Sequence, residues 1–293
     1  MNDFRKATLY MLAAYASIVI MSGMVKEASN HDVPPTQTLF FRFFLGLLFT
    51  VPLIIRERAF SWRILDFRSS MVRNGAGLLS MLFMFYSLKY LPLSTAIILS
   101  NTSAFFAPLF ILIIYKKKTS LATLACTAGG FVGVCMLLYE PGLGESRLPY
   151  LLTALLGAIF AALAYMGVKS LSRQHSALNI IFYFFLSGTV ILPFTYTSDW
   201  VVPSAHEALL LGLVGVFGLG FQLFATKAFA LAEVSEITPF IFISVILSAI
   251  SDWVLWGTVP DTRFWIGTAV ILISLHTLSV FNRQQTRAAR KSA

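Results

Sequence analysis

The sequence predicts an all-α polytopic membrane protein with ten transmembrane helices. Of its 293 residues, 57% are hydrophobic and only 12% are charged, which is about half the charged fraction of an average soluble domain. The mean hydropathy of +0.79 leaves too little polar surface to cover a water-soluble globule. A membrane-crossing helix needs about 20 apolar residues, so ten of them occupy about 200 positions. No room is left for a soluble catalytic domain.

Ten apolar runs follow one another along the chain and are separated by charged residues and turn formers. Prolines mark several of the connections, at Pro34, Pro92, Pro141, Pro203 and Pro260. The first run is too long for the hydrophobic part of a cleaved signal peptide, so we expect it to be the first span. The expected spans are residues 7–28, 36–55, 70–90, 93–115, 119–139, 149–169, 177–198, 206–231, 235–257 and 263–281.

The distribution of basic residues predicts the orientation of these spans. If both termini are cytoplasmic, the cytoplasmic segments hold 17 Lys or Arg and the opposite segments hold four, with Arg42 inside the membrane. This asymmetry is typical of the inner membrane of a bacterium, where positive charge is retained on the cytoplasmic side. The net charge of +9 is therefore interpreted as contact with solvent and the lipid bilayer, and not with nucleic acid.

The chain also resembles itself at an offset of 141 residues. That offset aligns residues 41–45 with residues 182–186, and it pairs Pro52 with Pro193 and Gly77 with Gly218. The two repeats are residues 1–143 and 148–293, with five spans each, and an odd number of spans turns the second copy upside down. Inverted repeats create a central site that opens to either face in turn, which is typical of a carrier.

Several phrases of the sequence resemble the drug/metabolite transporter superfamily, and its EamA-type ten-helix branch in particular. They are the phrase at 40–45, the turn at 88–94 and the glycine-rich stretch at 128–133, and the resemblance covers nearly the whole chain. It implies two inverted five-helix repeats around a cavity lined by the first, third, fourth, sixth, eighth and ninth spans. The fifth and tenth spans are then peripheral. The cargo of this family includes amino acids, S-adenosylmethionine, nucleotide sugars and other metabolites.

One departure from the family pattern limits what the resemblance implies. The family commonly ends its fourth and ninth spans with Gly-Glu, whereas residues 115–118 read Tyr-Lys-Lys-Lys and residues 256–258 read Trp-Gly-Thr. A role for that glutamate is therefore not transferred to this chain.

Polar residues inside the expected spans are the candidates for a substrate site, because polar groups at membrane depth must face protein, water or a ligand. Residues 100–103 are all polar and cover one helical turn, and Pro108 can free a backbone carbonyl there. Asn101 is the best single candidate, although small polar residues also bond neighbouring helices. Arg42 either contacts the substrate or a gate, or is a structural arginine that reaches the interface or caps neighbouring carbonyls. The candidate substrate-binding residues are Tyr15, Arg42, Tyr86, Asn101, Thr102, Tyr165, Gln222, Ser244 and Ser248.

Four further residues are candidates for gating or coupling. Lys26 and Lys169 match at an offset of 143 and are expected at opposite membrane faces, as end anchors or gates. Glu236 begins the ninth span. Asp252 lies close to its outer end, where it is either a hydrated acid or a carboxylate that couples transport to a proton or cation. Gly212, Gly215 and Gly218 form a stripe expected to pack closely against another helix.

No nucleotide-binding loop, metal-ligand spacing or catalytic triad is recognisable, so we expect no cofactor and no enzymatic activity. The first hypothesis is a secondary transporter that moves a small polar metabolite by alternating access, driven by a gradient, a coupling ion or an exchange substrate. The substrate class is an organic anion, an amino acid or S-adenosylmethionine, and the excess of basic residues in the spans favours a carboxylate or phosphate. The alternatives are a membrane-embedded enzyme and a non-transporting scaffold, which leaves the repeat unexplained.

Overall fold

The computed structural model describes residues 3–57, 66–115, 120–138, 147–172, 174–195, 199–232 and 240–292, and its regular structure over these residues is helical throughout. Each expected span overlaps a helix. The helices are α1 (Asp3–Asn30), α2 (Pro35–Glu57), α3 (Phe67–Tyr90), α4 (Leu93–Asn101), α5 (Ser103–Tyr115), α6 (Leu121–Leu138), α7 (Leu148–Leu171), α8 (Ala177–Ile191), the 3-10 helix η1 (Leu192–Thr195), α9 (Ala205–Leu231), α11 (Ile241–Trp256) and α12 (Thr262–Ser292).

Most of these helices are long and apolar enough to be membrane spans. Among the described residues, seven stretches are long and apolar enough to cross a bilayer, and they lie in α1, α2, α4 with α5, α7, α8 with η1, α9 and α12. Helices α6 and α11 are apolar but shorter. Helix α3 has 24 residues and is more polar, since it carries Arg68, Arg73 and Lys89. The prediction of a polytopic membrane protein is confirmed.

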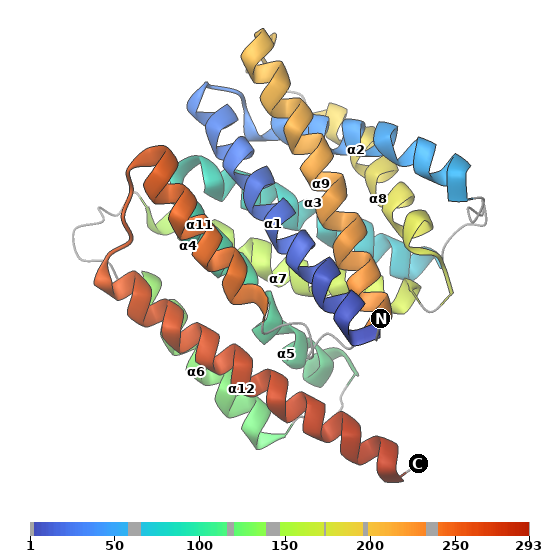
Figure 1. The fold of residues 1–293 in the computed structure, drawn as a ribbon, viewed down its shortest axis with the longest axis vertical. Helices are drawn as coiled ribbons and strands as arrows, with labels where there is room; N and C mark the ends of the chain where they lie inside the picture. The colour runs from blue at the N-terminus through green and yellow to red at the C-terminus, as the bar shows by residue number, and fades with distance from the viewer. Residues whose placement is uncertain are drawn as a thin grey trace.

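The helices pair across the chain. Helix α1 lies beside α9, α3 beside α7, α2 beside α8, and α4 beside α11. Helices α6 and α12 form a separate pair at one side of the bundle (Figure 1). Their backbones touch, because a Cβ atom added at Gly133 would lie 2.8 Å from the carbonyl oxygen of Gly267. The peripheral position of these two helices agrees with the fifth and tenth spans of the family pattern.

The expected span 93–115 is broken into two helices. A bend was expected at Pro108, but the break lies six residues earlier, at Thr102. The backbone N–H of Thr102 turns back to the carbonyl groups of Leu99 and Ser100, and its hydroxyl donates to the Leu99 carbonyl at 2.6 Å. Both donors of one residue therefore satisfy the last turn of α4 and end it.

The expected span 177–198 also ends early. Helix α8 stops at Ile191 and continues as η1, which contains Pro193, a residue that lacks the N–H needed to extend an α-helix. The glycine stripe of α9 is only partly used. A Cβ at Gly215 or Gly218 would collide with α2, whereas Gly212 has no neighbouring atom within 4 Å.

Candidate functional site

The ninth expected span carries a carboxylate that joins two helices. Asp252 of α11 is fully buried, so the expectation of a hydrated acid at this position is wrong. Its two oxygens accept from the backbone N–H groups of Leu93 at 2.9 Å and Ser94 at 2.7 Å. These are the first residues of α4, where free N–H groups and the helix dipole favour a negative charge. The carboxylate therefore caps α4 from a different helix.

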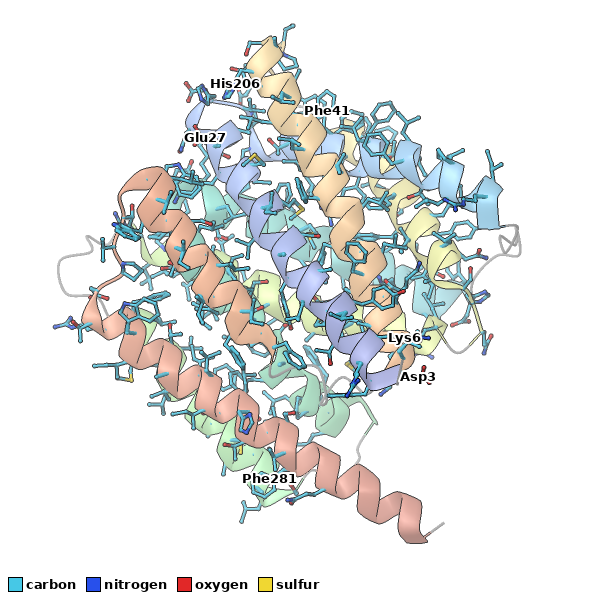
Figure 2. The ribbon with its side chains drawn as sticks, viewed as in Figure 1. Asp3, Lys6, Glu27, Phe41, His206 and Phe281 are labelled. Atoms are coloured by element: carbon cyan, nitrogen blue, oxygen red, sulfur yellow. The ribbon has the colours of Figure 1, made fainter. Side chains whose placement is uncertain are left out.

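Helix α1 is attached at the same place. Lys26 donates from Nζ to the Leu91 carbonyl at 2.8 Å, interacts electrostatically with Asp252, and lies 5.0 Å from the centroid of the Trp256 ring. The indole N–H of Trp256 donates to Glu27 Oε2 at 3.0 Å. Figure 2 shows Glu27 at the opposite end of α1 from Asp3 and Lys6.

We call the contacts among Lys26, Leu91, Leu93, Ser94, Asp252 and Trp256 the Asp252 joint. It links α1 and the start of α4 to α11. Of the other residues expected to gate or couple, Lys169 is exposed on α7, and Glu236 lies outside the described residues.

A second polar contact links the same two helices nearer their other ends. Asn101 donates from Nδ2 to the hydroxyl of Ser244 at 3.1 Å, so two predicted site residues are in direct contact. Ser244 and Ser248 are fully buried, and each donates its hydroxyl to a backbone carbonyl three residues earlier. The hydroxyl of Thr102 is already bonded to the Leu99 carbonyl at the helix break. Asn101 at the break is the most available of these groups, because the structure leaves it partly exposed.

A third group of polar residues contains a fully buried arginine. The guanidinium of Arg42 in α2 lies 5.2 Å from the Phe43 ring centroid and 5.8 Å from that of Phe185. Its Nε atom contacts the sulfur of Met21 at 3.3 Å. In the described part of the chain, neither Nη1 nor Nη2 has a hydrogen-bond partner. The structure therefore rules out an arginine that reaches the membrane interface.

A second buried arginine lies close by, and it was not among the predicted site residues. Arg73 of α3 is 4% exposed, and its Nη2 atom donates to Oε1 of Gln222 in α9 at 3.0 Å. Its guanidinium lies 3.9 Å from the Phe184 ring centroid, and Arg73 and Arg42 interact electrostatically. By position in the sequence, Arg73 lies near the inner end of α3, where arginines usually reach solvent. Only the glycine four residues later hinted at a close approach.

Two predicted tyrosines belong to this group and one does not. Tyr165 of α7 lies within electrostatic reach of Arg42 and Arg73, and Tyr15 of α1 lies within the same reach of Tyr165. Tyr86 lies instead on the exposed face of α3 that carries Leu79. We call Tyr15, Arg42, Arg73, Tyr165 and Gln222 the arginine cluster. It gathers side chains from α1, α2, α3, α7 and α9.

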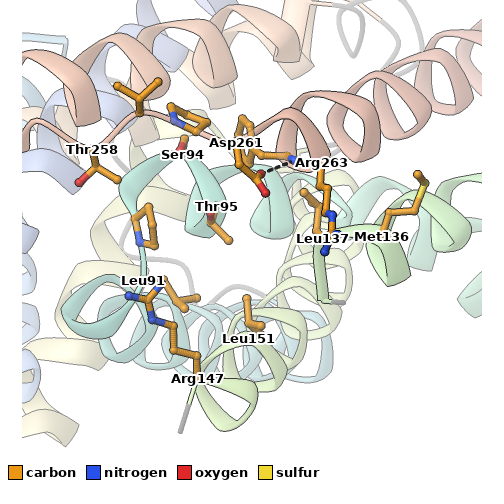
Figure 3. A pocket seen from close by; sticks show the side chains of 14 residues that line it. Leu91, Ser94, Thr95, Met136, Leu137, Arg147, Leu151, Thr258, Asp261 and Arg263 are labelled. Carbon is orange, nitrogen blue, oxygen red and sulfur yellow. Dashed lines mark hydrogen bonds between the residues drawn. The ribbon is translucent and has the colours of Figure 1, made fainter. Parts of the chain in front are cut away.

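A pocket of about 140 Å³ opens beside the Asp252 joint (Figure 3). Leu91 and Ser94 form part of its wall, and Arg147 and Arg263 lie at its rim. None of the predicted substrate-binding residues lines it, so we do not assign it as the substrate site. Within the described ranges, no group of three or more His, Cys, Asp or Glu side chains could hold a metal ion.

Comparison with known proteins places the chain in a family. Residues 5–139 and again residues 148–280 match the EamA-like transporter family. The chain belongs to this family. It is a transmembrane transporter and not an enzyme, as the sequence predicted. The first match lies within residues 1–143, and the second begins at residue 148 and ends at residue 280.

Named relatives align with this transporter over most of its length. The pseudopaline exporter CntI of Pseudomonas aeruginosa is 30% identical over 92% of this chain and 95% of its own. A riboflavin transporter of Vibrio cholerae is 26% identical over 98% of this chain and 97% of its own. An S-adenosylmethionine uptake transporter of Rickettsia prowazekii is 24% identical over 99% of both chains.

One solved crystal structure shares the fold, with a TM-score of 0.67 at 18% identity over 95% of this chain and 98% of its own. The named relatives carry different metabolites, and they include an exporter and an uptake carrier. Their names therefore establish small-molecule transport for the family and leave the substrate of this chain to its own residues.

Proposed function

We propose that this chain is a secondary transporter that moves a small polar metabolite by alternating access between two inverted five-helix halves, residues 1–143 and 148–293. We place it in a bacterial inner membrane with both termini in the cytoplasm, as the distribution of basic residues predicts.

Contacts between matched residues support the inverted halves. Phe43 and Phe184 are 141 residues apart, the offset of the sequence repeat, and their rings touch with centroids 4.9 Å apart. A residue that contacts its own counterpart lies on a two-fold axis, as at the centre of a symmetric dimer interface. The pairing of α2 with α8, which carry these two residues, fits the same axis.

The observation that carries alternating access is the Asp252 joint. At one end it fastens α11 of the second half to α4 of the first half through the hydrogen bonds to Asp252, and to α1 through the contact of Lys26 with Trp256 and the adjoining Trp256–Glu27 hydrogen bond. Broken helices at substrate sites are common in carriers, and here the break between α4 and α5 lies beside the Asn101–Ser244 contact. Release of the joint would open the path from that end to Asn101.

Counterflow in liposomes tests the proposal. Purified protein is reconstituted with one unlabelled metabolite inside, and the same labelled metabolite is offered outside, in separate carboxylate, phosphate-ester, amino-acid, S-adenosylmethionine and riboflavin panels. We expect saturable accumulation with one panel and none in protein-free liposomes. If folded, correctly inserted protein is silent in every panel, the carrier proposal is refuted for these substrate classes.

A further inference from the structure

The arginine cluster contains two buried positive charges that have no acidic partner among the residues the structure describes. Arg42 and Arg73 are 0% and 4% exposed, and the positive charge of Arg73 disfavours the charged form of Arg42. Buried charges in proteins are normally paired with an opposite charge. In the described part of the chain, the ion pair present is the one between His31 and Glu27, at the end of α1. Neither arginine has a carboxylate partner there.

The unused hydrogen-bond donors of the two arginines define what is missing. Nη1 and Nη2 of Arg42 and Nε of Arg73 are buried and have no acceptor among the described residues. The two Nη atoms of one guanidinium form a planar fork, which matches the two oxygens of a carboxylate or phosphate. Gln222 already satisfies Nη2 of Arg73 and holds that side chain in place.

The fold makes room for each guanidinium with a glycine. A Cβ atom at Gly218 would lie 3.1 Å from Cγ and from Nε of Arg42, and a Cβ atom at Gly77 would collide with Nη1 of Arg73. Gly77 and Gly218 are 141 residues apart, so they occupy matching positions of the sequence repeat. Both arginines belong to the first half, and Gly77 gives room within α3 whereas Gly218 gives room across the contact between α2 and α9. An arginine that merely extends to the interface does not need such a space.

Tyr165 lies next to the cluster and keeps part of its surface free. Ala158, Ala161 and Val168 share its face of α7, at spacings of seven, four and three residues, and all three are buried. Lys169, four residues after Tyr165, is exposed. Tyr165 is 40% exposed and lies within electrostatic reach of both arginines, so it keeps surface that a ligand can contact.

We propose that Arg42 and Arg73 bind the anionic group, a carboxylate or a phosphate, of a small organic anion carried by this protein. The inference rests on the proposed transport function, of which it specifies the substrate class. The anion bonds to the fork of Arg42 and to Nε of Arg73, and its charge removes the repulsion between the two guanidinium groups.

Direct binding tests the site without a transport step. The purified chain is heated with citrate, succinate, glycerol 3-phosphate or the neutral analogue succinamide at matched ionic strength, since a ligand that binds the folded state raises Tm. We expect stabilisation by a carboxylate or by the phosphate ester, and none by succinamide. Loss of one charge-assisted contact in Arg42→Gln or Arg73→Gln is expected to weaken binding roughly 10- to 150-fold. Arg263→Gln, at an exposed arginine of α12, is the matched control.

The melting temperature without ligand separates this role from a structural one. If the arginines stabilise the fold, Arg42→Gln lowers Tm in the absence of anion. If they await an anion, removal of an unpaired buried charge leaves Tm unchanged or raises it. Gly218→Ala keeps the charge but crowds Arg42, and it is expected to weaken anion binding as well.

Several outcomes would overturn the proposal. They are a lower ligand-free Tm in Arg42→Gln, equal stabilisation of wild type and both arginine variants, and no anion response from a folded protein. Counterflow of a neutral or cationic metabolite that is unchanged in Arg42→Gln and Arg73→Gln would refute the anion site and leave transport intact. Anion binding that depends on both arginines, without counterflow in any panel, would support the site and refute the carrier.

Discussion

Replacement of Asp252 by asparagine should release the joint between the two halves of the transporter. The asparagine keeps one acceptor oxygen for one of the two backbone N–H groups of Leu93 and Ser94. It turns an NH₂ group toward the other, which is then buried without an acceptor. The variant therefore loses at least one of the hydrogen bonds at 2.9 and 2.7 Å, together with the negative charge at the start of α4.

The size of the effect follows from the charge of the carboxylate. A hydrogen bond to an ionised group contributes about 1.5–3 kcal/mol, and about 1.4 kcal/mol changes an equilibrium tenfold. If the joint holds its end of the bundle closed, Asp252→Asn raises the population of the open state roughly 10- to 150-fold relative to the closed state. The fold itself keeps its other helix contacts.

A single cysteine at Gly23 reports this opening. A Cβ atom there would lie 3.8 Å from Trp256 and 4.0 Å from Leu93, so a side chain fits against the closed joint. Cys126 and Cys135 are both free and are first replaced by alanine. We expect a membrane-impermeant maleimide to label Gly23→Cys slowly, and at least tenfold faster when Asp252→Asn is added.

The matched control is Asp261→Asn. Asp261 also caps a helix, by accepting from the N–H of Phe264 at 2.8 Å, but it lies at the exposed start of α12 and this bond stays within the first turn of that helix. Labelling in this variant should equal that of the parent. If Asp252→Asn is folded and its labelling stays within twofold of the parent, the carboxylate does not hold the joint closed and the reasoning fails.

Two further predictions concern other helix contacts. Asn101→Leu is expected to lower counterflow while the protein stays folded, and wild-type transport in a well-inserted variant would remove Asn101 from the site. A double-mutant cycle of Asn101→Leu with Ser244→Ala should show a coupling of about 1 kcal/mol in thermal unfolding. Gly133→Ala is expected to lower the free energy of unfolding by about 1–3 kcal/mol, and Tm with it, since its Cβ would lie 2.8 Å from the Gly267 carbonyl oxygen. A Cβ atom at Gly212 would have no neighbouring atom within 4 Å, so Gly212→Ala should leave Tm unchanged or raise it. Equal effects of Gly133→Ala and Gly212→Ala on Tm would contradict the close approach of α6 and α12.

The helices were predictable from the sequence because the length of an apolar run determines membrane crossing directly. The partners of polar side chains were not, because they depend on which neighbouring helix each face meets. Asn101 was expected at the site, but its contact with Ser244 becomes visible only once α4 lies beside α11. Counting residues placed Arg73 near a membrane end. In the structure its side chain is instead buried, because it donates to Gln222 and the missing side chain of Gly77 leaves room for it. Counting residues also placed Asp252 near the outer end of its span, as a hydrated acid or a coupling carboxylate, whereas the structure buries it against α4.

The end of the α4 helix shows a second limit of prediction. Proline is a recognised helix breaker, so Pro108 marked the place where a bend was expected. The break lies instead at Thr102, whose hydroxyl and N–H both bond to the preceding turn. A threonine inside an apolar run has several uses, and the sequence does not say which one it serves.

The pairing of early helices with late ones bears on how this protein is made. Arg42 and Arg73 are synthesised in α2 and α3, but the residues that enclose them, Phe184, Gly218 and Gln222, belong to α8 and α9. Until those helices emerge, the two arginines lack these contacts, and Arg42 is left with first-made neighbours such as Met21 and Phe43. An arginine at membrane depth costs about 2.5–3.5 kcal/mol. The burial of both arginines is therefore completed only when α8 and α9 have been inserted.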